Sequence, residues 1–113
     1  MKYIIFLTIF FLIGNHAHAQ WQRTNGPFGG FINCLISDGT SIFAGTNGGI
    51  YLSTDNGNNW TPVNKGLPNG IVAALAISGT NIIAGTFGDG IYLSTDNGSN
   101  WTSINNGLKN TNV

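Results

Sequence analysis

The stretch that decides the fold is Ser53-Thr-Asp-Asn-Gly-Asn-Asn-Trp60, which recurs as Ser94-Thr-Asp-Asn-Gly-Ser-Asn-Trp101. In each octet an Ile-Tyr-Leu run leads into an Asp-Asn-Gly turn, and the Trp opens the next extended segment. Asn-Gly supplies the positive φ values that a tight hairpin turn needs. The Asp lies where a short carboxylate accepts hydrogen bonds from the backbone N–H groups of its own turn. Each octet therefore predicts a β-hairpin.

The chain around the octets repeats with them. Gly39-Thr-Ser-Ile-Phe-Ala-Gly-Thr46 returns as Gly79-Thr-Asn-Ile-Ile-Ala-Gly-Thr86, an offset of 79 − 39 = 40 residues. After one extra residue near Asp89 the offset becomes 101 − 60 = 41 residues. Self-similarity at about this period indicates a solenoid, a propeller or an array. Each unit has four strand-like segments, which in the second unit cover residues 71–77, 81–86, 90–94 and 101–105.

Four short antiparallel strands in a unit of about 40 residues fit a β-propeller blade. We therefore predict an all-β fold, an antiparallel β-propeller segment with two four-stranded blades and one flanking outer strand. Residues 71–77 are apolar throughout, which favours a strand covered on both faces. Trp60 and Trp101 are expected to be largely buried at equivalent positions.

The repeat also predicts how the chain is divided. The predicted parts are a signal peptide (1–19), a lone outer strand (20–28), a blade (29–67), a second blade (68–108) and the start of a third blade (109–113). Propellers need roughly four to eight blades to close. We therefore expect this chain to be part of a longer propeller, or to associate with copies of itself.

The first nineteen residues predict export. Lys2 supplies a short basic start, residues 3–13 are apolar except for Thr8, and Ala17-His-Ala19 is a small-x-small cleavage site. This is the pattern of a secretory signal peptide, and its apolar run is too short for a membrane span. Cleavage leaves Gln20 as the mature N-terminus of a secreted, periplasmic or cell-surface protein without a membrane span.

Charge and cysteine content exclude some classes of partner. The mature part has three cations and four acids, a net charge of about −1, from Arg23, Lys65, Lys109, Asp38, Asp55, Asp89 and Asp96. So weak a charge argues against a nucleic-acid partner. Cys34 is the single cysteine of the chain, so no internal disulfide forms. It is interpreted as a small buried apolar residue, with a reactive thiol as the alternative.

Both octets match Ser/Thr-x-Asp-x-Gly-x-x-Trp, so the chain resembles the Asp-box, or bacterial neuraminidase repeat, propellers. The matching residues are Ser53, Asp55, Gly57, Trp60, Ser94, Asp96, Gly98 and Trp101. Proteins with this repeat include sialidases, sortilin-type receptors, some xyloglucan-degrading glycosidases and photosystem II assembly-factor-like proteins. The whole pattern is most similar to exported multi-blade bacterial proteins of the type IX secretion kind. The resemblance implies that the octets are structural turns at the blade periphery, away from any active site.

The residues offer little for catalysis. Sialidase chemistry in the resembling families uses an arginine cluster, a Tyr/Glu pair and an acidic Asp, whereas the mature part has one Arg and no Glu. Glycoside hydrolysis usually needs two spaced carboxylates, and Asp55 and Asp96 each belong to a turn. Asp89 has no counterpart in the first unit. It is interpreted as a solvated turn residue, with a ligand contact as the alternative.

Metal and phosphate sites are not expected either. Asp55-Asn-Gly-Asn-Asn59 has the oxygen-bearing side chains of a calcium loop, but its Gly falls at the wrong position and no Glu closes it. Gly85-Thr-Phe-Gly-Asp-Gly90 lacks the Lys-Ser/Thr ending of a phosphate loop. We therefore predict no catalytic, cofactor or metal site in these residues.

The predicted function is that of an exported, non-catalytic propeller repeat protein, a binding or scaffold module for carbohydrate or protein at the cell surface. The alternative is a piece of a secreted sialidase-like or other glycoside hydrolase whose catalytic blades lie elsewhere. An assembly chaperone like the photosystem II factors is a third class. An arginine cluster or a pair of inward carboxylates in further blades would distinguish the enzyme from the binding module.

Overall fold

The structure is a computed structural model that describes residues 21–28 and 30–108. These residues form two four-stranded antiparallel sheets, each in chain order, and contain no helix. The first sheet consists of β1 (Ile32–Ser37), β2 (Ile42–Thr46), β3 (Gly49–Ser53) and β4 (Thr61–Pro62). The second consists of β5 (Val72–Ser78), β6 (Asn81–Thr86), β7 (Ile91–Ser94) and β8 (Thr102–Ser103). The predicted all-β propeller-segment class is confirmed.

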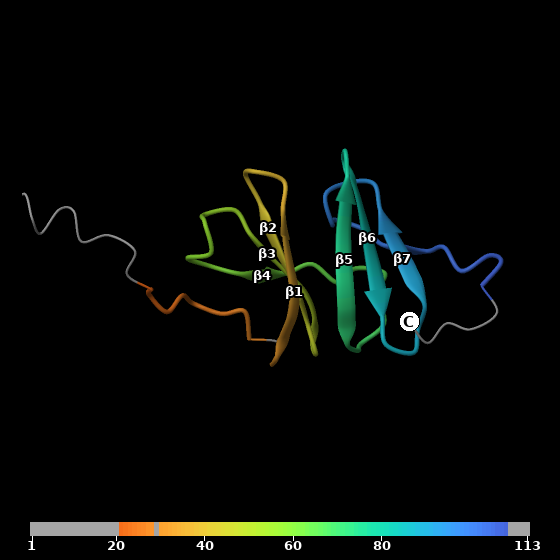
Figure 1. The fold of residues 1–113 in the computed structure, drawn as a ribbon, viewed down its shortest axis with the longest axis horizontal. Coiled ribbons are helices and arrows are strands. Elements are labelled where there is room, and N and C mark those ends of the chain that lie inside the picture. Colours follow the sequence, from red (N-terminus) through yellow and green to blue (C-terminus); the bar gives the residue numbers. More distant parts are fainter. Residues whose placement is uncertain (1–20, 29, 109–113) are drawn as a thin grey trace, which may run out of the picture.

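The two sheets are built alike because their sequences repeat. In each, the first strand carries a β-bulge at the same place, between Ile32 and Cys34 in β1 and between Val72 and Ala74 in β5. A bulge increases the local twist and bends the strand. Figure 1 shows the sheets side by side, with β1 and β5 as the neighbouring strands. This is how the innermost strands of consecutive propeller blades are arranged.

The covered face of the first sheet follows from its register. Residues opposite one another in adjacent strands share a face, and Ile36, Phe43 and Leu52 are opposite one another across β1, β2 and β3. Cys34, Gly45 and Ile50 form the next such row on the same face. Phe43 and Ile50 are buried, because this face packs against the second sheet.

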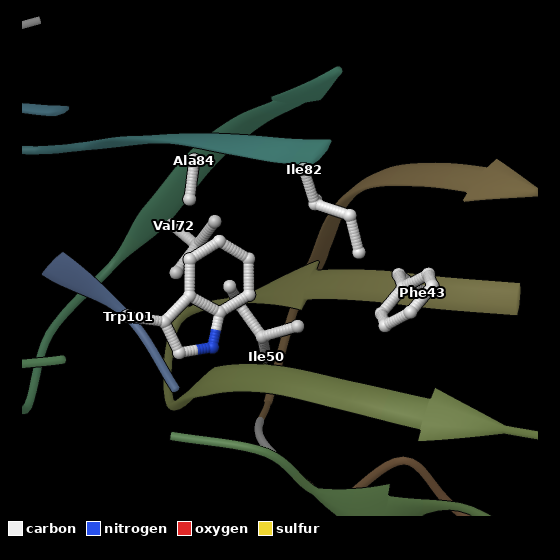
Figure 2. Packing of buried hydrophobic residues seen from close by; sticks show 6 residues of the cluster. All are labelled: Phe43, Ile50, Val72, Ile82, Ala84 and Trp101. Atoms are coloured by element: carbon white, nitrogen blue, oxygen red, sulfur yellow. The ribbon is translucent and has the colours of Figure 1, made fainter. Parts of the chain in front are cut away.

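The second sheet contributes its opposite face to the same core. Val72, Ile82, Ala84 and Trp101 are buried there and form one cluster with Phe43 and Ile50. Figure 2 shows the Trp101 indole among Val72, Ala84 and Ile50, between strands of the two sheets. Burying a large apolar side chain contributes roughly 1.5–3 kcal/mol. The shared cluster therefore makes the two sheets one packed unit.

The expected outer strand is not formed by the described part of its segment. Residues 21–24 have no strand pairing, and the side chain of Trp21 is fully exposed. Asn25 makes an isolated parallel bridge with Asn59, in which the Asn25 N–H donates to Asn58 O at 3.1 Å. A strand needs a neighbour with a row of free backbone groups. The neighbour here is the turn of the first octet, so residues 21–24 form no strand with the described part of the chain, and the closing-blade strand stays a prediction.

Two other expectations differ from the structure for one physical reason. Trp101 is buried, but Trp60 is only half-buried. Strand β5 is covered on one face, whereas Ala74 and Ala76 on its other face are exposed. A side chain is buried only where another element lies against it, and within the described residues each sheet has one neighbour. In addition, the fourth strand expected over 101–105 is reduced to the two residues of β8.

Cys34 is half-buried rather than buried, and desolvation raises the pKa of its thiol. The predicted signal peptide (1–19) and the predicted start of a third blade (109–113) lie outside the described residues. Within the described part of the chain, no helix has the length and apolar character needed to cross a membrane.

Candidate functional site

The first octet closes on itself through its serine and its aspartate. The Ser53 hydroxyl donates to Asp55 Oδ1 at 2.9 Å and accepts from the Gly57 N–H at 2.8 Å. Asn59 donates twice to the same carboxylate, from its backbone N–H to Oδ1 and from Nδ2 to Oδ2, both at 2.9 Å. The carboxylate therefore accepts three hydrogen bonds from its own turn.

The second octet repeats this geometry. Ser94 donates to Asp96 Oδ1 at 2.8 Å and accepts from the Gly98 N–H at 2.8 Å. Asn100 donates to the two oxygens of Asp96 at 2.9 and 2.8 Å. In both turns the central Asn and Gly have positive φ, 60° and 88° in the first and 57° and 88° in the second. Two successive positive φ values belong to the type I′ hairpin turn that Asn-Gly favours.

These hydrogen bonds hold the carboxylates in the charged form. The side chain of Asn100, then its backbone N–H and the Ser94 hydroxyl, lower the pKa of Asp96 to about 2. The corresponding donors, Asn59 first, also lower the pKa of Asp55. Hydrogen bonds to a carboxylate favour its ionised form. Both groups are therefore anionic at neutral pH.

We expect the stability of the chain to fall in acid through these two turns. The folded pKa of Asp96 lies below its ordinary value of 3.8, so its contribution is complete above about pH 4 and is lost as the pH falls toward about 2. Thermal unfolding followed by circular dichroism should give a Tm that is level from about pH 7 to 5 and falls below about pH 4. The double variant D55N/D96N should start from a lower Tm and lose less on acidification. A variant with an undiminished acid dependence would contradict this assignment.

The two tryptophans differ although their octets agree. Trp101 Nε1 donates to Val63 O at 2.8 Å, and the Trp101 backbone N–H donates to Lys65 O at 2.9 Å. Residues 62–66 thus form a receptor for this side chain, which we call the Trp101 socket. Trp60 Nε1 instead donates to Gly57 O within its own octet at 3.0 Å and to Thr24 Oγ1 at 3.4 Å.

The Trp101 socket requires close contact between backbones. Gly66 has φ +95°, and a Cβ built there would collide with the backbone of Trp101. A Cβ on Gly98 would lie 3.0 Å from Phe43 Cε1, which belongs to the first sheet. The octet of one sheet is thus fitted directly against the fourth segment of the sheet before it.

The family model of the DUF6242 beta propeller domain matches residues 10–112. The chain belongs to this family. No curated protein and no solved structure matches the chain. Membership of the DUF6242 propeller family agrees with the blade-like stacking of the two sheets and leaves the activity of the chain to be proposed from its residues.

Two repeated positions of this DUF6242 propeller chain were missed by the sequence analysis. Asn64 Oδ1 accepts from the Ile50 N–H at 2.7 Å, and Asn105 Oδ1 accepts from the Ile91 N–H at 2.7 Å. Each amide thereby ties the segment after the octet to the third strand. The sequence does mark these two residues as a repeated pair, since Asn-x-Gly-Leu recurs at Asn64 and Asn105 with the 41-residue offset. The hydrogen-bond partner of Asn64 could not be predicted from the sequence, because Ile50 lies 14 residues away along the chain.

Thr46 and Thr86 are the second missed pair. Both are buried, and their hydroxyls donate to Gly49 O at 2.8 Å and to Gly90 O at 2.7 Å. The Thr46 hydroxyl also accepts from the Gly48 N–H at 3.0 Å, and that of Thr86 accepts from the Asp89 N–H at 3.2 Å. The extra residue near Asp89 is therefore accommodated without loss of the hydrogen bonds of this threonine hydroxyl.

The remaining acids of the DUF6242 propeller chain lie in turns. Asp38 Oδ1 accepts from the backbone N–H groups of Ser41 at 2.7 Å and Thr40 at 2.9 Å, and these bonds lower its pKa. Asp89 is exposed in the β6–β7 connection. In the described residues, no three His, Cys, Asp or Glu side chains gather as a metal site would require. The predicted absence of catalytic, cofactor and metal sites remains a prediction.

Proposed function

We propose that this chain is an exported, non-catalytic propeller module of the Asp-box class, which acts as a binding or scaffold protein at the cell surface. Both octets fill every defined position of the Asp-box pattern. The Ser, Asp and Gly of the two octets make the same contacts in both sheets, which supports a common structural role for these residues.

The observation that carries the proposal is that the repeated carboxylates are engaged in hydrogen bonds within their own turns. Asp55 and Asp96 each accept three hydrogen bonds from their own octet, and those bonds lower their pKa values. A general acid must hold a proton near the working pH, and its pKa is usually raised for that purpose. Carboxylates held in the ionised state by their own turn suit fold stabilisation better than acid catalysis.

Export is proposed from the first nineteen residues, which have the basic start, apolar run and Ala-His-Ala site of a signal peptide. The overall similarity to exported multi-blade proteins supports the type IX secretion route. Expression of the full chain in a Gram-negative host should place the product outside the cytoplasm with Gln20 as its first residue. A product retained in the cytoplasm with Met1 intact would contradict export.

The non-catalytic role is tested by measuring turnover and stability on the same samples. Fluorogenic sialosides and other aryl glycosides should show no hydrolysis above buffer for the wild type, D55N or D96N, while both variants lower the Tm. All assays are run well below the lowest Tm. Turnover by the wild type that D96N abolishes in the folded state would overturn the proposal in favour of a glycosidase.

A further inference from the structure

Asn-Gly is the dipeptide in which an asparagine side chain reacts most readily with its own backbone. The backbone nitrogen of the glycine attacks Cγ of the asparagine, and glycine has no Cβ to obstruct this approach. The new N–Cγ bond closes a succinimide ring as the Cγ–Nδ2 bond breaks and ammonia leaves. Water then opens the ring at either carbonyl, which gives aspartate or isoaspartate. The dipeptide occurs six times in this chain, at Asn25, Asn47, Asn56, Asn69, Asn97 and Asn106.

Exposure of the asparagine side chain does not distinguish these pairs, because all six asparagines are exposed. The pairs differ in the backbone N–H of the glycine, the group that must lose its proton in the attack. A proton held in a hydrogen bond is harder to remove, and a nitrogen fixed against an acceptor is less free to approach Cγ. The reactivity of each pair therefore depends on whether its glycine N–H has an acceptor.

In both octets the glycine N–H is held by the serine. Gly57 donates to Ser53 Oγ and Gly98 donates to Ser94 Oγ, each at 2.8 Å, and both glycines are buried. The asparagine before each glycine has a positive φ, 60° in the first octet and 57° in the second, so the turn also fixes its backbone. The nitrogen that would attack is thus bound to a hydroxyl within the turn.

Two other pairs are restrained in part. The Gly48 N–H donates to the hydroxyl of the buried Thr46 at 3.0 Å, which repeats the octet arrangement outside the octets. Asn25 is held through its own groups instead. Its Nδ2 donates to Asn59 Oδ1 at 3.4 Å, and its backbone N–H donates to Asn58 O at 3.1 Å. We expect this pair to react at an intermediate rate, since its side-chain amide is tied and its glycine is not.

The remaining two pairs lack these restraints. Within residues 21–28 and 30–108, neither the Gly70 N–H nor the Gly107 N–H donates a hydrogen bond. Neither Asn69 nor Asn106 has a positive φ. The first of these pairs lies in the connection between β4 and β5, and the second follows β8. Both therefore have an exposed amide next to a backbone nitrogen that is free to attack it.

We propose that Asn69 and Asn106 are sites of spontaneous conversion to aspartate and isoaspartate, whereas the octet serines keep Asn56 and Asn97 as amides. The serine then has a chemical role in addition to its structural one. Each conversion adds a negative charge to a chain with few charges. Isoaspartate also adds a main-chain carbon, which at Asn69 lengthens the connection between the two sheets. This proposal does not depend on the proposed function.

Peptide mass spectrometry tests the proposal on the purified full chain, after incubation in mildly alkaline buffer well below its Tm. Fragmentation locates each conversion of an amide to an acid. Asn69 and Asn106 should convert first, and Asn47, Asn56 and Asn97 should lag behind them. In guanidinium chloride, where the hydrogen bonds are lost, all Asn-Gly pairs should convert at similar rates. Equal rates at all pairs in the folded chain would overturn the proposal.

Ser94→Ala tests the role of the hydroxyl, and the intact first octet is its control within the same molecule. Loss of the acceptor for the Gly98 N–H should raise the conversion rate at Asn97 roughly two- to tenfold, the equivalent of about 0.5–1.5 kcal/mol for one hydrogen bond. The rate at Asn56 should stay as in the wild type. An equal rise at both sites would show that conversion follows unfolding of the chain, and an unchanged rate at Asn97 would show that the hydroxyl gives no protection. Either result would contradict the role assigned to the serine.

Gly70→Ala tests the reactive pair itself. The φ of Gly70 is not positive, and a Cβ there meets only Asp89 Oδ2, at 3.5 Å, which is an ordinary van der Waals distance. The fold should therefore tolerate the methyl group, which hinders the approach of the nitrogen to Cγ. Conversion at Asn69 should fall to the level of Asn56, while Asn106 converts as before. Conversion at Asn69 with the wild-type rate would exclude cyclisation at this pair.

Discussion

Replacement of Trp101 by alanine should lower the free energy of unfolding by about 3–5 kcal/mol, the range for loss of a large buried aromatic side chain. Trp101 is 4% exposed, packs in the cluster shared by both sheets and donates to Val63 O. Its removal opens a cavity between the sheets and leaves the partly buried Val63 carbonyl without this donor. Urea unfolding followed by circular dichroism, at a protein concentration low enough to keep the chain monomeric, measures the loss.

Trp60→Ala is the matched control, because it removes the same side chain from the same turn geometry. Trp60 is half-buried and donates within its own octet. Its loss should cost roughly half as much or less, since less apolar surface returns to water. Equal losses at Trp60 and Trp101 would show that the indole acts through its turn and not through the contact between sheets.

Gly66→Ala should be the most disruptive single-methyl change in the described chain. Gly66 has φ +95°, and its new Cβ would collide with the backbone of Trp101. Left-handed backbone costs a non-glycine residue roughly 1–2 kcal/mol. The collision adds to that strain, because it pushes Trp101 out of its socket. We expect unfolding at lower urea concentration and a red-shifted tryptophan emission as the indole becomes wetter.

Gly107→Ala isolates the collision from the strain. Gly107 is the repeat counterpart of Gly66 and has φ +90°, but a Cβ there meets nothing within 4 Å. It should show only the backbone cost of roughly 1–2 kcal/mol. Gly66→Ala should exceed it by roughly 2 kcal/mol or more, the scale of overpacking in a tight contact. If the two variants are equally stable, Gly66 is needed only for its φ value.

The octet turns could be predicted from sequence because all their partners are local. Asp55 reaches donors within four residues, and Asn56 and Gly57 tolerate positive φ by their own chemistry. The strand at residues 81–86 was predicted with the bounds that β6 has, since turn residues stop it at both ends. The family match and the sheet order agree with the 40-residue period, which is a property of the sequence alone.

Nearly identical stretches of sequence differ in burial where contacts between the sheets determine it. Trp60 and Trp101 end nearly the same octet, yet only Trp101 is buried, because only it has a sheet of the described chain against its ring. The acceptor role of Asn64 likewise depends on Ile50, 14 residues away across the blade. The sequence by itself determined the hairpin turns, the ionised aspartates and the repeated blade unit. The tertiary structure decided which of the two tryptophans is buried, because burial depends on what another sheet covers and not on the residue itself.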